Sequence, residues 1–215
     1  EYIDQQKIIS AVILQSKNGR LRLLNENNRE VNFSEKRLAH VSEASIDTTI
    51  ARSDIVSQLK TLTENRVKLS ESIDIKELWE ILQGESGEID VSTMTLFCFD
   101  PPLTSDHESA VIRAFFRDRL YFKFNNLIFA PYSPEQVEAR KRQIREAEKK
   151  EALTRKGAAW INHILNSKNG SPTETDPRVV DILKSYFLFN TDAPDYLTAR
   201  SIIKRSALNS PEQLP

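Results

Sequence analysis

The sequence is poor in cysteine and has no long hydrophobic run. Its single cysteine, Cys98, cannot form an internal disulfide, and its neighbours Phe97 and Phe99 indicate a packed core residue rather than a nucleophile. No apolar stretch approaches the roughly 20 residues that span a bilayer. The first residues show no basic-then-apolar signal segment. We therefore expect a soluble, cytoplasmic protein that does not associate with membranes.

The sequence also lacks the residue groupings that most catalytic sites need. His40, His107 and His163 are isolated, with no cysteine or histidine at metal-ligand spacing, so we interpret them as structural or surface residues. The aspartates form no dense cluster that would gather two Mg²⁺ ions. The segment from Gly84 to Gly87 matches no phosphate-binding loop, because its acidic residue would repel phosphate. We expect neither a catalytic site, a metal nor a small-molecule cofactor within these residues.

The two ends of the chain predict that it is part of a longer protein. Residues Ser210 to Gln213 form a capping box with proline at the first helical position, but only two residues follow. The same four residues occur at Ser133 to Gln136, where a long helix-compatible segment does follow. Glu1 is not an initiator methionine. These observations favour an absent downstream domain.

The chain has 215 residues, of which 39% are hydrophobic, enough for one large or two small domains. Residues 1–43 have strand periodicity: Leu21 and Leu23 alternate with Arg20 and Arg22 after an Asn-Gly turn. Four short strands in this range predict a small β-barrel. Residues 44–73 contain an apolar stripe at helical spacing and predict a connecting helix.

Residues 74–132 have the order of a winged-helix (helix-turn-helix) module. Three short segments of helical spacing are followed by a hairpin in which Phe122 and Phe124 alternate with polar residues. Residues 133–215 predict a helical region, which begins with a long helix. In Glu135–Lys156, 13 of 22 residues are charged, so this helix should be a solvated strut. The expected fold is α+β and mainly helical.

Two groups of basic residues could bind nucleic acid, although the net charge is only −1. The first lies in the β unit and the second on the third helix and wing of the winged-helix module, with Tyr121 as a stacking surface. Solubilising charge on an exposed face explains both patterns equally well. The candidate RNA-binding residues are Lys17, Arg20, Arg22, Arg37, Arg113, Arg117, Arg119, Tyr121 and Lys123.

Acidic residues oppose binding of a DNA duplex. The segment Glu71–Asp118 contains eleven acidic and three basic residues, a net charge of −8. Such a field repels phosphates from the first two helices of the winged-helix module, while a narrow basic edge can still guide a single strand.

Several short segments resemble the N-terminal region of bacterial and organellar ribonuclease II family exoribonucleases. In the β unit they are Ile13–Leu24, Arg29–Phe33 and Lys36–Ser42. Four further segments resemble the family variant in which a helix-turn-helix module precedes the catalytic domain. They are Glu77–Leu82, Asp118–Lys123, Ser133–Arg140 and Ser210–Gln213. The resemblance therefore spans nearly the whole chain.

This resemblance implies a parent enzyme that degrades single-stranded RNA from the 3′ end and releases nucleoside monophosphates. Mg²⁺ would be held by clustered aspartates in a catalytic domain beyond Pro215, and none of that motif is present here. The expected role is to bind or guide single-stranded RNA and to position the chain's own downstream catalytic domain. The alternatives are a winged-helix DNA-binding regulator and a protein-interaction region.

Overall fold

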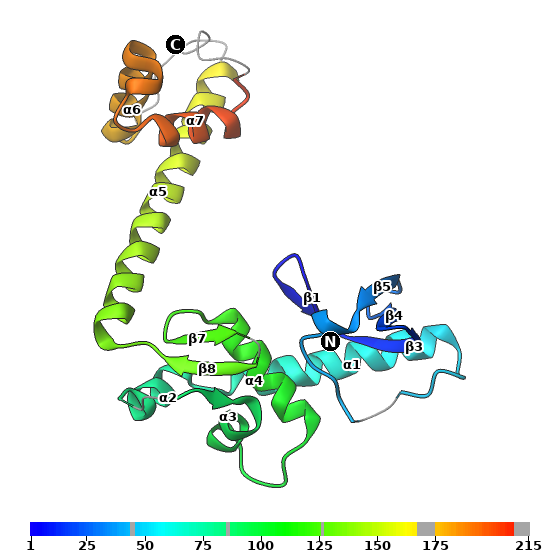
Figure 1. Cartoon of the computed structure of the whole chain (residues 1–215). Helices are drawn as coiled ribbons and strands as arrows, with labels where there is room; N and C mark the ends of the chain where they lie inside the picture. Colours follow the sequence, from blue (N-terminus) through cyan, green and yellow to red (C-terminus); the bar gives the residue numbers. More distant parts are fainter. Residues whose placement is uncertain (44–45, 85–86, 126, 167–174, 209–215) are drawn as a thin grey trace. The chain divides into compact units, whose positions relative to one another are not determined.

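The computed structural model describes residues 1–43, 46–84, 87–125, 127–166 and 175–208. It divides into two compact units, Glu1–Val137 and Glu138–Pro215, which are described separately (Figure 1). The capping box at Ser210 to Gln213 and the middle of the segment from Gly84 to Gly87 lie outside the described residues. None of the helices in the described ranges combines the length and the apolar composition that crossing a bilayer requires.

The first unit begins with two antiparallel sheets. A hairpin pairs β1 with β2, and a separate three-stranded sheet has the order β3-β4-β5. Asn18 and Gly19 form the two-residue turn between β3 and β4 with φ of 51° and 71°, as the Asn-Gly pair predicts. The elements are β1 (Tyr2–Asp4), β2 (Lys7–Ile9), β3 (Ala11–Lys17), β4 (Arg20–Asn25), β5 (Glu30–Ser34) and a 3₁₀ turn (Glu35–Arg37).

The prediction of a small β-barrel is wrong, because neither of these sheets closes on itself. Other elements cover the two faces of the three-stranded sheet instead. Leu21 and Leu23 pack on Tyr2 and Ile9 of the β1–β2 hairpin. On the opposite face, Leu24 packs against the helix α1 (Arg52–Glu71), whose contacting residues include Ile55 and Leu59. Because a helix already buries that face, ring closure is not needed to shield the strands.

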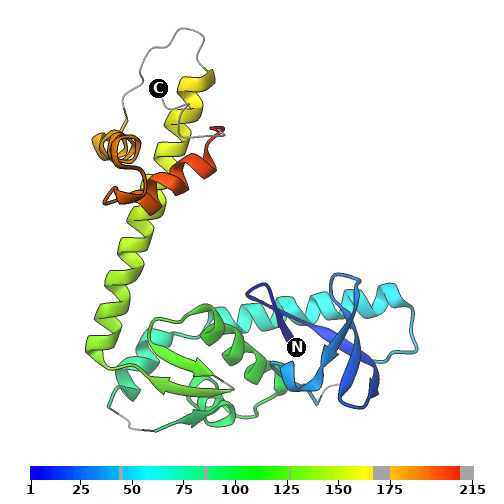
Figure 2. The same ribbon diagram turned by 45° about the horizontal axis from the view of Figure 1, so that its top comes forward.

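The rest of the first unit has the arrangement of a winged helix. Two strands of its small sheet form the wing, and the third, β6, pairs with β8 to give the order β6-β8-β7. Figure 2 shows α1 extending along both the strands and the neighbouring helix α4. The elements are α2 (Ile75–Leu82), β6 (Ile89–Asp90), α3 (Val91–Cys98), α4 (Ser105–Arg117), β7 (Phe122–Asn125) and β8 (Ile128–Pro131).

Aromatic side chains form the centre of the winged-helix core. Phe115 on α4 packs edge-on against Phe122 and Phe129 of the wing, with ring centroids 5.0 and 4.6 Å apart. Cys98 packs at the edge of this core, and burial raises the pKa of its thiol to about 12. The thiol is therefore protonated near neutral pH, as expected for a packing residue rather than a nucleophile.

The second unit packs the far part of one long helix against two shorter ones. Ile161 on α5 (Pro134–Asn166) is fully buried with residues of α6 (Pro177–Phe189) and α7 (Tyr196–Arg205). A short 3₁₀ turn, Asn190–Asp192, connects α6 to α7. Gly157 allows α5 to approach α7, because a Cβ added there would lie 2.9 Å from Cδ1 of Ile202.

The predicted strut is confirmed for the middle of α5, where residues 142–151 are all exposed. Its ion pairs differ in detail from the expected spacing of four. Glu138 pairs with Lys141 at 2.8 Å, and Glu151 pairs with Arg205 on α7 rather than with Arg155. Near its midpoint, α5 thus forms an exposed ion pair with a residue of another helix.

We predict that Gly157→Leu destabilises the second unit by about 1–3 kcal/mol, because the added side chain overlaps Ile202. Unfolding can be followed by the fluorescence of Trp160, which packs on the same core, in a Trp79→Phe background. Gly87→Ala is the control, since nothing lies within 4 Å of the added Cβ. Equal stability of the two variants would contradict the close approach of α5 and α7.

Candidate nucleic-acid interface

The three-stranded sheet exposes one polar, basic face beyond the part that α1 covers. Lys17 is the register partner of Arg20, and Gln15 is that of Arg22, which in turn pairs with Asn32. Alternation places these side chains on one face, while Leu21 and Leu23 point into the core. We call this surface the basic sheet face; it comprises Gln15, Lys17, Asn18, Arg20, Arg22 and Asn32.

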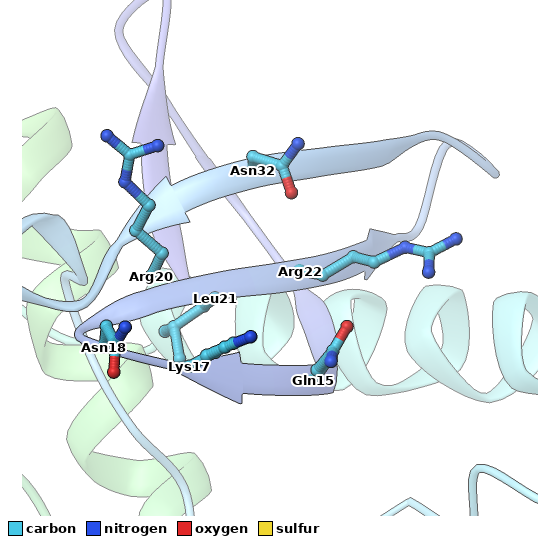
Figure 3. A pocket seen from close by; sticks show the side chains of 7 residues that line it. All are labelled: Gln15, Lys17, Asn18, Arg20, Leu21, Arg22 and Asn32. Carbon is cyan, nitrogen blue, oxygen red and sulfur yellow. The ribbon is translucent and has the colours of Figure 1, made fainter.

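The basic sheet face surrounds a surface hollow of about 430 Å³, with its side chains drawn from β3, β4 and β5 (Figure 3). Lys17, Arg20 and Arg22 supply positive charge, and the amides of Gln15, Asn18 and Asn32 supply both donors and acceptors. No ion pair within the described residues involves Lys17 or Arg20. Their charges therefore remain open to an external anion.

Arg22 is partly compensated by a neighbouring carboxylate. Its Nη2 lies 2.6 Å from Oε2 of Glu30, and the same carboxylate also pairs with Arg52 at 2.5 Å. Hydrogen bonds from Arg22 and Arg52 lower the pKa of Glu30. Two arginines share one negative charge here, so this corner of the basic sheet face keeps a net positive charge.

Arg37 does not join the basic sheet face. Its guanidinium lies 4.6 Å from the centroid of the Phe33 ring, and Phe33 packs with the core on the other face of the sheet. The structure therefore separates Arg37 from Lys17, Arg20 and Arg22, with which the sequence grouped it.

The structure also divides the second predicted group. Arg117 and Arg119 are exposed at the end of α4 and line a second hollow. Lys123 is exposed on β7 but does not line it. The ring of Tyr121 packs against that of Trp79, with centroids 5.4 Å apart, at the edge of the winged-helix core. At least one face of the Tyr121 ring is thus used in packing against Trp79.

The structure places the candidate RNA-binding residue Arg113 largely in the interior. Its side chain is only 9% exposed, and its Nη2 lies 2.5 Å from Oε1 of Glu1. The sequence could not indicate this contact, because Glu1 and Arg113 are brought together only by the fold. Arg113 holds the strands and α4 together, and although it lines the second hollow its guanidinium is already paired with Glu1.

Glu1 is the centre of a buried ionic network. Arg66 on α1 donates from Nη1 to Oε1 of Glu1 at 3.0 Å and from Nε to Oδ1 of Asp106 at 2.8 Å. Burial alone would raise the pKa of the Glu1 carboxyl, but Arg113 and Arg66 lower it to about 2. The carboxylate therefore stays charged inside the protein and joins β1, α1 and α4.

His40 lies beside this network and is buried with its Nδ1 without a hydrogen-bond partner among the described residues. Its Nε2 lies 3.2 Å from Oε2 of Glu108. Burial lowers the pKa of His40 despite this carboxylate. We interpret His40 as a packing residue between the strands and α4, and His107 as part of the helix cap at Thr104.

Several residues of these surfaces were missed by reasoning from the sequence. The amides of Gln15 and Asn32 could have been found, because the strand period aligns them with Arg22. Lys7 lines the second hollow with Arg117, but more than a hundred residues separate them in the sequence. No sequence signal connects such a pair.

The two units differ in net charge. Residues 1–137 contain sixteen basic and twenty-one acidic residues, and residues 138–215 contain fourteen basic and ten acidic ones. The net charges are therefore −5 and +4. Binding of nucleic acid by the first unit must depend on local basic surfaces rather than on its overall field. In the described ranges, no three His, Cys, Asp or Glu side chains gather as a metal site requires.

Comparison with protein families gave one match, which covers the second unit. Residues 137–214 match the model of the family HTH_RNase_II, described as a double HTH domain. This bears out the resemblance to a helix-turn-helix region of ribonuclease II family exoribonucleases, but the matched residues are 137–214 and not residues 74–132, where the sequence predicted the helix-turn-helix module. The match covers α5 from Val137, α6 and α7 and begins after the winged-helix module. Neither the comparison with curated proteins nor that with solved structures gave a match.

We predict that the network around Glu1 makes the stability of the first unit depend on pH. The lowered pKa of Glu1 stabilises the fold fully above its ordinary value of 4.5, and this contribution is lost as the pH falls toward 2. The difference in unfolding free energy between the wild type and Glu1→Gln should shrink over this range by about 3 kcal/mol.

Chemical denaturation at a series of pH values measures this difference. Glu35→Gln, on the exposed 3₁₀ turn, is the matched control and should differ from the wild type by the same small amount at every pH. A Glu1→Gln difference that does not change between pH 5 and 2 is incompatible with the network.

Proposed function

We propose that this chain, whose residues 137–214 carry the double helix-turn-helix domain of ribonuclease II family exoribonucleases, is an RNA-binding accessory region of a 3′-to-5′ exoribonuclease. It holds single-stranded RNA and positions a catalytic domain supplied by the rest of the protein. It is not itself catalytic. The observation that carries the proposal is the basic sheet face, where Lys17, Arg20 and Arg22 line a hollow together with three amides.

The chemistry of this face suits RNA better than a general anion. Cations at neighbouring register positions can contact successive phosphates, and binding then releases counterions. The amides of Gln15, Asn18 and Asn32 can pair with the exposed edges of unstacked bases. A small curved sheet with both features is a common platform for single strands.

The acidic part of the winged-helix module favours a single strand over a duplex. Its first two helices lie in the segment of net charge −8. A duplex is wide and stiff, so it would bring many phosphates close to this field, whereas a single strand can follow the basic surfaces alone. Arg117, Arg119 and Lys123 are the further contacts that we propose on this module.

A DNA-binding regulator is the alternative, supported by the helix-turn-helix match and the net charge of +4 in the second unit. Helix-turn-helix domains commonly place a helix in the major groove of DNA. Arg200 and Lys204 are exposed on α7 and could contact a duplex there. A protein-interaction region is a third possibility, for which neither nucleic acid should bind.

Mg²⁺ enters this proposal only through the downstream catalytic domain. Clustered aspartates of that domain would hold the ion, and the ion would activate the water that hydrolyses the RNA presented by this region. No residue of the chain described here is assigned to that chemistry.

We predict that Lys17→Ala/Arg20→Ala/Arg22→Ala weakens binding of single-stranded oligouridine and makes it less sensitive to salt. Each lost phosphate contact lowers the slope of log K against log salt by about 0.7, so the slope should fall by about 2. Titrations at several salt concentrations measure this. Lys60→Ala/Lys68→Ala/Lys76→Ala removes the same charge from other exposed positions and should leave the slope nearly unchanged. Equal changes of the slope in the two triple variants would rule out the basic sheet face as an RNA-binding surface.

We also predict that the wild-type chain binds single-stranded RNA more tightly than a DNA duplex of the same length. A competition titration at a single salt concentration gives the ratio directly. Preference for the duplex would instead favour the DNA-binding regulator. Absence of binding to both would favour a protein-interaction region.

A further inference from the structure

We propose that the hollow between the β1–β2 hairpin and the end of α4 is a binding site for one nucleotide of the RNA strand. This proposal rests on the RNA-binding function proposed above and names a second contact point for the same ligand. The hollow measures about 660 Å³, within the range of small-molecule sites. The residues that carry the argument are Gln6, Lys7, Phe116, Arg117 and Arg119.

Cations from separate elements converge on this hollow. Lys7 comes from β2, Arg117 is the last residue of α4, and Arg119 follows two residues later. No acidic side chain is among the described residues that line it. Because the first unit has a net charge of −5, such a concentration of positive charge is a local exception and fits a phosphate group.

A stacking surface lies next to these cations. Phe116 is half-buried in the wall of the hollow, and the guanidinium carbon of Arg119 lies 4.9 Å from the centroid of its ring. Nucleic-acid bases stack on aromatic rings and on arginine planes. The Phe116–Arg119 pair can therefore hold a base while Lys7 and Arg117 hold its phosphate.

The turn that contains Gln6 has an unfavourable backbone conformation for its residues, whereas a comparable turn elsewhere in the chain has a favourable sequence. Gln5 and Gln6 have φ of 45° and 65°, in the left-handed region that non-glycine residues rarely adopt. The β3–β4 hairpin has a turn of the same length and uses the favoured pair Asn18 and Gly19. Gln6 lines the hollow, and its side-chain amide can both donate a hydrogen bond to a base edge and accept one from it. Binding of a base by Gln6 would explain why the chain keeps this strained backbone conformation.

Arg113 also lines the hollow, and its buried contacts hold the hollow in shape. Arg113 donates to the carbonyl of Ile8 at 3.4 Å and to Oγ of Ser10 at 3.0 Å, while Glu1 balances its charge. These contacts fix the second strand of the hairpin relative to α4. A site formed from two distant parts of the chain is thereby ordered before the ligand arrives.

The turn provides the sharpest test. Gln5→Asn/Gln6→Gly introduces the favoured turn pair, so the full chain should be more stable to heat but should bind oligouridine about fivefold more weakly, as for one lost hydrogen bond. Gln5→Asn alone is the matched control, because it keeps Gln6 and should retain wild-type affinity. A double variant that binds as tightly as the control would overturn the role of Gln6.

The cations are tested by their effect on salt dependence. Lys7→Ala/Arg117→Ala should lower the slope of log K against log salt by about 1.4, and the loss should add to that of the basic sheet face triple variant. Lys60→Ala/Lys68→Ala removes equal charge from exposed positions of α1 and should not change the slope. A slope equal to that of this control would overturn the proposal.

The stacking pair is tested with Phe116→Leu, which keeps apolar bulk but removes the ring. The variant should bind about tenfold more weakly at high salt, where phosphate contacts contribute least.

These experiments distinguish failure of the nucleotide site in the hollow from failure of the proposed RNA-binding function. If only the basic sheet face variants weaken binding, the hollow is not a site; if the wild-type chain does not bind RNA, both proposals fail.

Discussion

The buried carboxylate of Glu1 is the contact on which the architecture of the first unit depends. A charge removed from water is costly unless it is paired and hydrogen-bonded, and here two arginines from different helices provide the pairing. Arg66 extends the network to Asp106 and Ser42, so strands, α1 and α4 meet at one point. The loss of Glu1 would leave Arg113 without its carboxylate partner in the interior.

The buried contacts of the first unit also affect which basic side chains lie on its surface. Because α1 covers one end of the three-stranded sheet, only the other end is exposed, and that end carries Lys17, Arg20 and Arg22. Because Arg113 is held in the interior by Glu1, the basic residues that remain at the end of α4 face the β1–β2 hairpin. The proposed RNA contacts are thus two separate surfaces of one unit. The helix-turn-helix domain of residues 137–214 adds a positively charged unit to a negatively charged one.

Much of the fold could be predicted from local patterns. The Asn18-Gly19 turn, the apolar stripe of α1, the cap at Asp74 and the alternation of Phe122 with Lys123 each depend on residues close together in sequence. Closure of the strands into a barrel was the wrong expectation, because nothing in residues 1–43 reveals that a later helix covers them. The pairing of Glu151 with Arg205 instead of Arg155 has the same origin. Local charge patterns indicate several possible ion-pair partners for a residue, and the tertiary structure determines which pair forms.

The sequence by itself determined the order of the elements, the polar character of the strut, the alternation that exposes Arg20 and Arg22, and the resemblance to ribonuclease II family enzymes. These properties follow from periodicity and local hydrogen bonding, which act over a few residues. Only the tertiary structure decided which basic residues remain on the surface. Arg113 and Arg117 lie on the same helix four residues apart and both line the second hollow, yet the guanidinium of Arg113 is paired with the buried carboxylate of Glu1 while Arg117 is exposed. Burial depends on what distant segments bring to that place, and no local pattern contains this information.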